Sequence, residues 1–246
     1  MPEKLYNELA KYYDLFNFSN YKKQADFILS TARKIFANKK NIKVLDLACG
    51  TGEHIKILKK FFQIEGRDLN AGMLKVSQKK NPGLAIKKGD LNDLLIKENS
   101  FDLIYCLSSS IQYVLNPKDL PKVLKAIYKG LKPKGIFIFD LAYCREKWQE
   151  GYVGIRTVVK KDLQLAEIFK SRSINNISYY NPIYLLNDKG KFKFYIDDHK
   201  IYLYSINEVK FALKKSGFSK IYLKDNYSDR DFNNKNNQLP VFVAIK

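Results

Sequence analysis

The stretch Val44-Leu45-Asp46-Leu47-Ala48-Cys49-Gly50-Thr51-Gly52 decides the fold of this chain. An apolar run over 42–47 carries an acid near its end, and two glycines then lead into a helical pattern. We expect a buried strand, a tight turn and the start of a helix. Glycines let the backbone of such a turn approach a ligand closely. The free N–H groups at a helix N-terminus suit a polar or anionic ligand group.

A second acid, Asp68, follows another apolar run at 61–64. In a doubly wound sheet the ends of neighbouring strands meet at the edge where nucleotides bind, so Asp46 and Asp68 are both expected to face a ligand. A dinucleotide fingerprint requires a third glycine at position 55, where this chain has Ile55. The Gly-Lys-Ser/Thr of a phosphate-binding P-loop is also missing from the sequence. The turn is therefore typical of a site for a nucleoside without a pyrophosphate.

Five segments in chain order resemble the motifs of the class I S-adenosylmethionine (SAM) methyltransferases. The first is the glycine turn, which is similar to the family's Asp-x-(Gly/Ala)-x-Gly-x-Gly. The next four resemble the second-strand motif, the adenine-edge motif, the fourth strand and the turn into the fifth strand. In this chain they are Gly66–Leu74, Lys88–Leu91, Phe101–Cys106 and Leu131–Asp140. Each segment is common on its own, but five in this order indicate the family.

The resemblance implies a SAM-binding site, with S-adenosylhomocysteine as the product. Asp68 would accept hydrogen bonds from both ribose hydroxyls, and Asp46 would meet the donor's amino group. Leu69 and Leu91 would enclose the adenine, and Asp90 would accept from its exocyclic amine unless it is only a turn residue. The cofactor-binding residues expected in this way are Tyr13, Asp46, Ala48, Gly50, Gly52, Asp68, Leu69, Met73, Asp90 and Leu91.

Over nearly its full length the chain resembles the N,N-dimethyltransferases that act on nucleotide-linked amino sugars. The similar segments outside the donor site are Tyr12–Leu15, Ser109–Ile111, Gly151–Val153 and the strand that carries His199. Three segments depart from that pattern. Leu239 stands where the family has an arginine near its C-terminus that meets the substrate's phosphate, and Arg230 or Lys235 could serve instead. Gln112-Tyr113 stands where the family often has His or Tyr after Ser-Ser-Ile-Gly. Asp140–Tyr143 replaces an acid-Pro-Trp-Trp sequence.

The resemblance implies an enzyme, a transferase that moves a methyl group from SAM to a small-molecule acceptor, in particular an amine. Methyl transfer from a sulfonium is an in-line displacement, so the protein mainly positions donor and acceptor. It requires no metal, but an amine must be bound neutral or lose a proton. The candidate catalytic residues are Tyr13, Tyr113 and His199. A packing role is the alternative for each, and for His199 we favour it, as a hydrogen-bonded structural histidine.

The net charge of +19 raises the alternative of an RNA (rRNA or tRNA) methyltransferase. Only six of the 44 basic residues are Arg, the residue on which dedicated phosphate-binding sites rely. Lysines 118, 122, 125 and 129 share one face of a predicted helix whose other face is apolar. That pattern is typical of a solvated surface. We therefore favour a small-molecule substrate over nucleic acid, and keep a non-catalytic SAM-binding protein as a further alternative.

Strands and helices alternate up to residue 140, which predicts an α/β fold with parallel strands and right-handed crossovers. We predict a Rossmann-like seven-stranded sheet with helices on both faces. Turn signals then separate four β-rich segments, which predict an inserted antiparallel sheet. These segments are Ile155–Val159, Leu163–Ser173, Ile177–Leu186 and Lys191–Tyr204. The predicted divisions are a core with N-terminal helices (one over Leu5–Tyr12) at 1–152, the insertion at 153–204 and a return to the core at 205–246.

Other features of the sequence bear on the location and the oligomeric state of the protein. The apolar runs are too short to span a membrane, and the polar N-terminus lacks the apolar core of a signal peptide. The cysteines at 49, 106 and 144 are odd in number and never at CxxC spacing, so we expect buried thiols and no metal site. These features predict a cytoplasmic protein. We expect a monomer or a homodimer, with the inserted sheet able to supply an interface.

Overall fold

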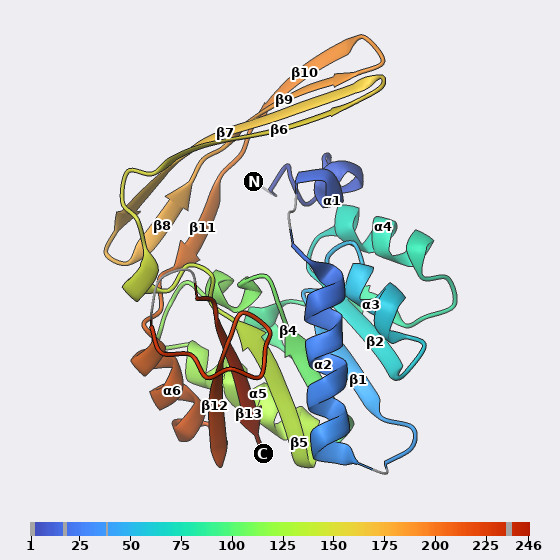
Figure 1. The fold of residues 1–246 in the computed structure, drawn as a ribbon, viewed down its shortest axis with the longest axis vertical. Coiled ribbons are helices and arrows are strands. Elements are labelled where there is room, and N and C mark those ends of the chain that lie inside the picture. Colours follow the sequence, from blue (N-terminus) through green and yellow to red (C-terminus); the bar gives the residue numbers. More distant parts are fainter. Residues whose placement is uncertain (1–2, 17–18, 38, 235–237) are drawn as a thin grey trace.

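The computed structural model describes residues 3–16, 19–37, 39–234 and 238–246, so Lys235 lies outside the described residues. A seven-stranded sheet with the order β12-β13-β5-β4-β1-β2-β3 forms its centre (Figure 1). Strands β1 to β5 are parallel, whereas β13 is antiparallel to both β5 and β12. The strands are β1 (Lys43–Leu47), β2 (Gln63–Asp68), β3 (Ile86–Lys88), β4 (Phe101–Cys106), β5 (Leu131–Asp140), β12 (Lys220–Asp225) and β13 (Pro240–Ile245). This arrangement confirms the predicted fold class.

Helices cover both faces of this sheet (Figure 1). One apolar cluster joins α2 and α3 to one face, and a second joins α5 and α6 to the other. The helices are α2 (Tyr21–Phe36), α3 (Glu53–Leu58), α4 (Ala71–Lys80), α5 (Leu120–Gly130) and α6 (Ile206–Lys215). Because both faces are covered, all six residues of β4 are buried. A capping box between Ser205 and Glu208 begins α6.

The inserted sheet has six strands and extends beyond the core as a long, curled arm (Figure 1). Its strands are β6 (Val153–Lys160), β7 (Leu163–Ile174), β8 (Ile177–Tyr180), β9 (Ile183–Asp188), β10 (Lys191–Ile196) and β11 (His199–Tyr202). The long segments predicted at 177–186 and 191–204 are each two strands. Pro182 lacks an N–H for the ladder and separates β8 from β9. Asp197 and Asp198 separate β10 from β11.

The predicted helix over Leu5–Tyr12 is wrong. The chain there forms turns, followed by the short helices η1 (Ala10–Tyr12) and α1 (Tyr13–Phe16). We call residues 4–16 the N-terminal segment. Its backbone groups bond to neighbouring elements instead of to a helix ladder: Leu5 N donates to Asp197, and the Tyr6 carbonyl accepts from Met73 N.

The N-terminal segment lies between the core and the inserted sheet (Figure 1). Its apolar side chains pack against the inner face of that sheet, in a cluster that includes Leu5, Leu9, Tyr12, Leu165 and Tyr184. Its other side contacts α4, where a Cβ built on Gly72 would lie 2.5 Å from the Asn7 Cα. The segment therefore links the two sheets across the opening between them.

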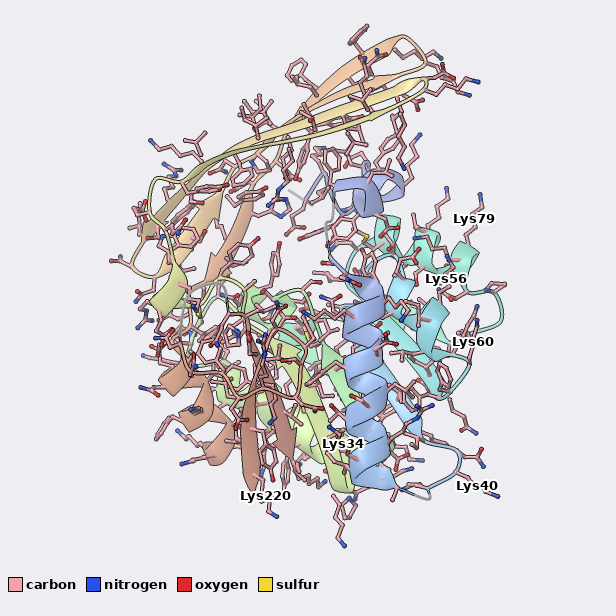
Figure 2. The ribbon with its side chains drawn as sticks, viewed as in Figure 1. Lys34, Lys40, Lys56, Lys60, Lys79 and Lys220 are labelled. Carbon is pink, nitrogen blue, oxygen red and sulfur yellow. The ribbon has the colours of Figure 1, made fainter. Side chains whose placement is uncertain are left out.

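Surface features agree with two of the expectations. Lysines 118, 122, 125 and 129 are exposed. Figure 2 shows lysines from several elements projecting outward, among them Lys34 on α2, Lys79 on α4 and Lys220 on β12. The three cysteines are buried and free. Within the described ranges, no helix combines the length and apolar character needed to cross a membrane.

Candidate active site

A cavity lies at the carboxyl ends of β1, β2 and β4, where a doubly wound sheet binds its ligand. We call it the donor cavity. Nine of the ten predicted cofactor residues line it, from β1 and its turn, the end of β2, the start of α4 and η2 (Leu91–Asp93). They are Tyr13, Asp46, Ala48, Gly50, Asp68, Leu69, Met73, Asp90 and Leu91. Gly52 lies behind this wall.

The glycine turn has left-handed backbone geometry at Ala48 (φ +57°), Gly50 (φ +53°) and Gly52 (φ +76°). A Cβ at Gly52 would lie 2.2 Å from the Ser77 Oγ, so this glycine allows α3 to approach α4. The third glycine of a dinucleotide motif is replaced in an unusual way. Ile55 is fully buried, and its Cδ1 lies 2.6 Å from where Gly66 of β2 would place a Cβ. In this chain the glycine that permits α3 to pack closely on β2 is therefore Gly66, on the strand, and not a residue of the helix.

Asp68 braces the turn while it lines the donor cavity. Its carboxylate accepts hydrogen bonds from Gly50 N (2.8 Å) and Asn70 N (2.9 Å), one on each oxygen. Burial raises the pKa of Asp68, and these backbone donors oppose the rise. A carboxylate has about four acceptor sites, so both oxygens keep capacity for a ligand's hydroxyl groups.

Asp46 is 2% exposed and accepts a hydrogen bond from the Tyr105 hydroxyl at 2.9 Å. Burial raises the pKa of Asp46 well above its usual value, and the nearby Asp68 adds to the effect. Our sequence reasoning missed Tyr105. A tyrosine in a strand buried on both faces needs a partner for its hydroxyl, and that signal was available.

Asp90 is the N-cap of η2 and accepts from Asn92 N at 2.8 Å. The turn role considered for it is therefore real, and the same residue also lines the donor cavity. Leu69 and Leu91 line the cavity too, and Leu69 is 46% exposed.

Asp14 fastens the N-terminal segment over the donor cavity. Its carboxylate accepts from the Thr51 Oγ1 (2.7 Å) and the Tyr21 hydroxyl (2.9 Å) and forms an ion pair with Lys80. Lys80 also pairs with Glu53 at 2.7 Å. Tyr13 beside Asp14 is thereby held in the cavity wall.

A second cavity, the acceptor cavity, adjoins the first. The two share Tyr6, Tyr13, Ser108 and Tyr113. Its volume of about 320 Å³ falls in the range of small-molecule sites. The inserted sheet supplies much of the far wall, including Glu167, Phe169, Ser171, Tyr180 and His199.

Glu167 is a buried carboxylate in that wall, and sequence reasoning missed it. It accepts from Arg156 (3.0 Å) and from the Tyr180 hydroxyl (2.5 Å), and it is 2% exposed. Burial and the adjacent Glu167 raise the pKa of Tyr180 above its usual range, so this hydroxyl stays protonated. Glu167 and Arg156 face each other across a strand pair, β6 and β7.

The structure brings the three predicted catalytic residues to one region. The Tyr113 hydroxyl lies 2.8 Å from the Tyr6 hydroxyl and 3.2 Å from the His199 Nδ1. The His199 Nε2 lies 3.0 Å from the Asp197 Oδ2. Tyr13 is part of the shared wall, with its ring centroid 5.9 Å from that of Tyr6. His199 thus has the hydrogen-bonded structural setting that we favoured, and it also lines the acceptor cavity.

The loop after β4 is held by Asp140 at the end of β5. Ser108 N and Ser109 N each donate to its carboxylate at 2.7 Å. These bonds stabilise two residues with left-handed geometry, Ser108 (φ +57°) and Ser109 (φ +60°). Burial raises the pKa of Asp140, and its hydrogen-bond donors, including the Tyr227 hydroxyl, oppose the rise. Ser108 lines both cavities, so Asp140 positions part of their common wall.

Comparisons with known proteins agree with this architecture. The family model described as "Methyltransferase domain" matches residues 44–135. The chain is 25% identical over 229 residues to a dTDP-3-amino-3,6-dideoxy-alpha-D-glucopyranose N,N-dimethyltransferase from Streptomyces fradiae, covering 91% of this chain and 88% of that protein.

Two solved structures superpose over nearly the whole chain. DesVI from Streptomyces venezuelae has a TM-score of 0.83 at 23% identity, covers 97% of both chains and shows the same fold. A SAM-dependent methyltransferase from Clostridium acetobutylicum has a TM-score of 0.80 at 25% identity and covers 98% of both chains. The matched domain, the relatives, the fold and the donor cavity agree: this chain is a SAM-dependent methyltransferase.

Proposed function

We propose that this enzyme methylates the amine of a small molecule, in particular an amino sugar linked to a nucleotide. The observation that carries the proposal is the junction of the two cavities at Tyr6, Tyr13, Ser108 and Tyr113. A donor sulfonium on one side of this junction faces an acceptor on the other. An in-line displacement needs this arrangement, because the reacting atoms must approach within about 3–3.5 Å.

In the donor cavity, Asp68 binds the ribose hydroxyls, Asp46 meets the amino group of the methionyl part, and Asp90 accepts from the adenine amine. The carboxylate of Asp68 has one backbone bond on each oxygen and retains acceptor capacity. Leu69 and Leu91 lie against the adenine. Ala48, Gly50 and Met73 complete the wall, and Gly52 shapes the turn behind it.

At the junction, Tyr13 lies over the methionyl end of SAM and Tyr113 orients the acceptor amine. Burial raises the pKa of both hydroxyls above their ordinary values, so both stay protonated at neutral pH. His199, bonded to Tyr113, accepts the proton that an ammonium must lose before it can attack. The attacking nitrogen lone pair forms the new N–CH₃ bond while the S–CH₃ bond breaks and its electrons stay on sulfur.

A polar groove continues from the acceptor cavity to the surface, and it supports a nucleotide-linked substrate. It shares Phe16, Ser19, Tyr143 and Arg156 with that cavity. Lys23 and Asn226 line its outer part. Two cationic side chains along one path suit the phosphates of a nucleotide attached to the sugar. The dimethyltransferase from S. fradiae is named for a dTDP-linked amino sugar.

The test is transfer of radiolabelled methyl from SAM to a matched acceptor panel. The panel holds a dTDP-linked amino sugar, the same compound with a hydroxyl in place of the amine, a free amino sugar and bulk RNA. We expect label on the dTDP-linked amine and none on its hydroxyl analogue. Label on RNA, falling steeply as salt rises, would replace this acceptor with a nucleic acid. If no member of the panel is labelled although the protein binds SAM, the protein is a non-catalytic SAM-binding protein.

We propose that the outer face of the inserted sheet forms a homodimer with a second copy of this chain. Three neighbouring cross-strand rows of four residues form an uncharged patch on this face, although charged residues make up 28% of the chain. Lys170, Arg172 and Lys200 lie on the same face beyond the patch. Phe192 and Phe194 are 78% and 71% exposed. The rows are Ile155–Ile168–Ile183–Ile196, Thr157–Ala166–Leu185–Phe194 and Val159–Gln164–Asn187–Phe192.

This uncharged patch lets two copies of a +19 chain meet without bringing their lysines together. Sedimentation equilibrium tests this arrangement. We expect a dimer that Phe194→Lys converts to a monomer. Phe211→Lys, on α6 and 68% exposed, is the matched control and should leave the dimer intact. A wild-type monomer at all concentrations would contradict the proposal.

A further inference from the structure

One carboxylate, Asp197, joins the N-terminal segment to the acceptor cavity. Its Oδ1 accepts from Lys4 N at 2.9 Å, and its Oδ2 accepts from Leu5 N at 2.8 Å and faces the His199 Nε2 at 3.0 Å. Asp197 is 4% exposed and His199 is 3% exposed. These bonds connect residues 192 and 193 positions apart in the chain. The segment that lines both cavities is thus fastened by the same group that contacts the histidine.

This contact fixes the direction of the hydrogen bonds around His199. An ionised carboxylate only accepts, so Nε2 must carry the proton that points to Asp197. In a neutral imidazole Nδ1 is then an acceptor, and it takes the Tyr113 hydroxyl proton. The Tyr113 oxygen in turn accepts from the Tyr6 hydroxyl. The chain of hydrogen bonds runs from Tyr6 through Tyr113 to His199, and the one acceptor nitrogen of the imidazole, Nδ1, is bonded to Tyr113 in the shared wall.

We infer that Asp197 is a positioning residue that couples docking of the N-terminal segment to the proton-accepting state of His199. The inference rests on the proposed N-methylation. The segment carries Tyr6 and Tyr13 into the wall between the two cavities. Docking therefore encloses the donor and acceptor and, through Asp197, holds Nδ1 ready for a proton. An undocked segment would remove two donors from Asp197 and Tyr6 from the hydrogen-bonded chain.

The proton step balances within these groups. The N–H bond of the acceptor ammonium breaks and its proton passes to the Tyr113 oxygen, whose own proton moves to the His199 Nδ1. The resulting imidazolium is paired with the Asp197 carboxylate. Four titratable side chains face His199: Asp197 beside it in the chain, Tyr113 from η3 (Ser110–Tyr113), Tyr6 from the N-terminal segment and Tyr180 from β8. Burial alone would raise the pKa of Asp197, but His199 and the backbone N–H groups of Leu5 and Lys4 lower it to about 2. Asp197 is therefore the one of these four side chains that is charged at neutral pH.

Nitrogen-15 NMR of the imidazole rings tests the inference without any assay of activity. The chain has two histidines, and His54, which contacts Gln24, serves as the internal reference. In the wild type at neutral pH we expect His199 to be protonated on Nε2 and unprotonated on Nδ1. The opposite tautomer in the wild type would overturn the inference, whatever the variants do.

Two variants then separate positioning from mere support of the segment. Asp197→Asn offers an amide N–H to Nε2, so the His199 tautomer should switch to Nδ1–H, and hydrogen exchange of the Lys4 and Leu5 amides should speed up. Asp188→Asn is the matched control. Asp188 also holds the segment, through the Tyr12 hydroxyl at 2.5 Å, but it does not contact His199. It should loosen the segment at Tyr12 while Lys4 and Leu5 stay bonded to Asp197, and so leave the His199 tautomer unchanged.

Activity supplies the second readout. Loss of general-base function costs about 10²- to 10⁴-fold, so kcat of Asp197→Asn should fall about 10²-fold. The acid side of its pH–rate profile should move to lower pH, since the imidazolium loses its paired charge. Asp188→Asn should raise the Kd for SAM with little change in kcat. Equal losses of kcat in the two variants, or an unmoved profile, would contradict the coupling. If the wild type methylates no amine, the proposed function fails, while the tautomer and exchange measurements still decide the coupling.

Discussion

The seven-stranded sheet and the inserted sheet build their halves of the site in different ways. In the donor half, a contiguous turn after β1 and an acid at the end of β2 supply most of the wall, and parallel strands bring their carboxyl ends together. In the acceptor half, Tyr113 meets His199 across 86 positions and Leu5 meets Asp197 across 192. The donor half is thus formed mainly by short contiguous segments at the ends of neighbouring strands. The acceptor half forms only when segments that are distant in the sequence pack together.

Asp68→Ala should break the donor half most severely. Each hydrogen bond from a ribose hydroxyl to a charged group contributes about 1.5–3 kcal/mol, so loss of two weakens SAM binding by at least about 10²-fold. Isothermal titration calorimetry with SAM and S-adenosylhomocysteine measures this directly. Binding of an acceptor nucleotide should change far less, since it lies in the other half. Retained SAM affinity would remove Asp68 from the site.

Acid should destabilise the core through His54. Burial lowers the pKa of His54 to about 4, from 6.5. Between these values the unfolded chain binds a proton at His54 and the folded chain does not, so the free energy of unfolding falls as pH drops from 6.5 to about 4. The effect amounts to roughly 3 kcal/mol over that window. Urea titrations across pH should show this slope, and it should be shallower in His54→Gln. Equal slopes in the two proteins would contradict the account.

The two glycines of the turn should differ in their tolerance of a side chain. Gly52→Ala places a Cβ 2.2 Å from the Ser77 Oγ in left-handed backbone, whereas a Cβ at Gly50 meets no atom within 4 Å. Overpacking costs about 1–3 kcal/mol and left-handed backbone about 1–2 kcal/mol. Gly52→Ala should therefore lower the thermal midpoint more than Gly50→Ala, which carries backbone strain alone. Equal midpoints, measured by calorimetry, would show that α3 does not pack on α4 as described.

Glu167→Gln should weaken binding of the acceptor without weakening binding of SAM. It keeps an oxygen for Tyr180 but loses the charge that pairs with Arg156. Hydrogen bonds to charged groups contribute about 1.5–3 kcal/mol when buried, but Arg156 is partly exposed. We expect roughly a tenfold rise in KM for the acceptor with the Kd for SAM unchanged. Glu150→Gln, an exposed carboxylate of the same region, is the control. A change in SAM affinity would mean that the halves are not separate.

Nine of the ten cofactor residues expected from the motifs line the donor cavity, and their contacts with SAM remain a prediction. Apolar runs ending in acids fixed the strand ends, and the glycine turn fixed the cavity between them. The same reasoning failed for the N-terminal segment, where apolar spacing resembled a helix but backbone groups are bonded to Asp197 and to α4. It also merged β8 with β9, although Pro182 marked the break.

The acceptor half was only partly predictable, because the roles of its side chains depend on contacts with residues that are far away in the sequence. His199 was found through the family resemblance, and Tyr113 was found from its place in the loop after the fourth strand, at the carboxyl edge of the sheet. Glu167 was missed because an acid alternating with apolar residues in a strand is ordinarily exposed, and its partner Arg156 lies on another strand. Asp197 was not singled out either, although its place two residues before His199 in a predicted strand was a signal that the two side chains could meet.

The most direct test of the central claim is a crystal structure of the complex with S-adenosylhomocysteine and a dTDP-linked amino sugar. We expect the adenosine between Leu69 and Leu91, with its ribose on Asp68. The sugar amine should lie between Tyr13 and Tyr113, on the line through the sulfur along which a methyl group would pass. An amine bound elsewhere, or a nucleotide that does not contact the inserted sheet, would contradict the claim that these two cavities form one active site.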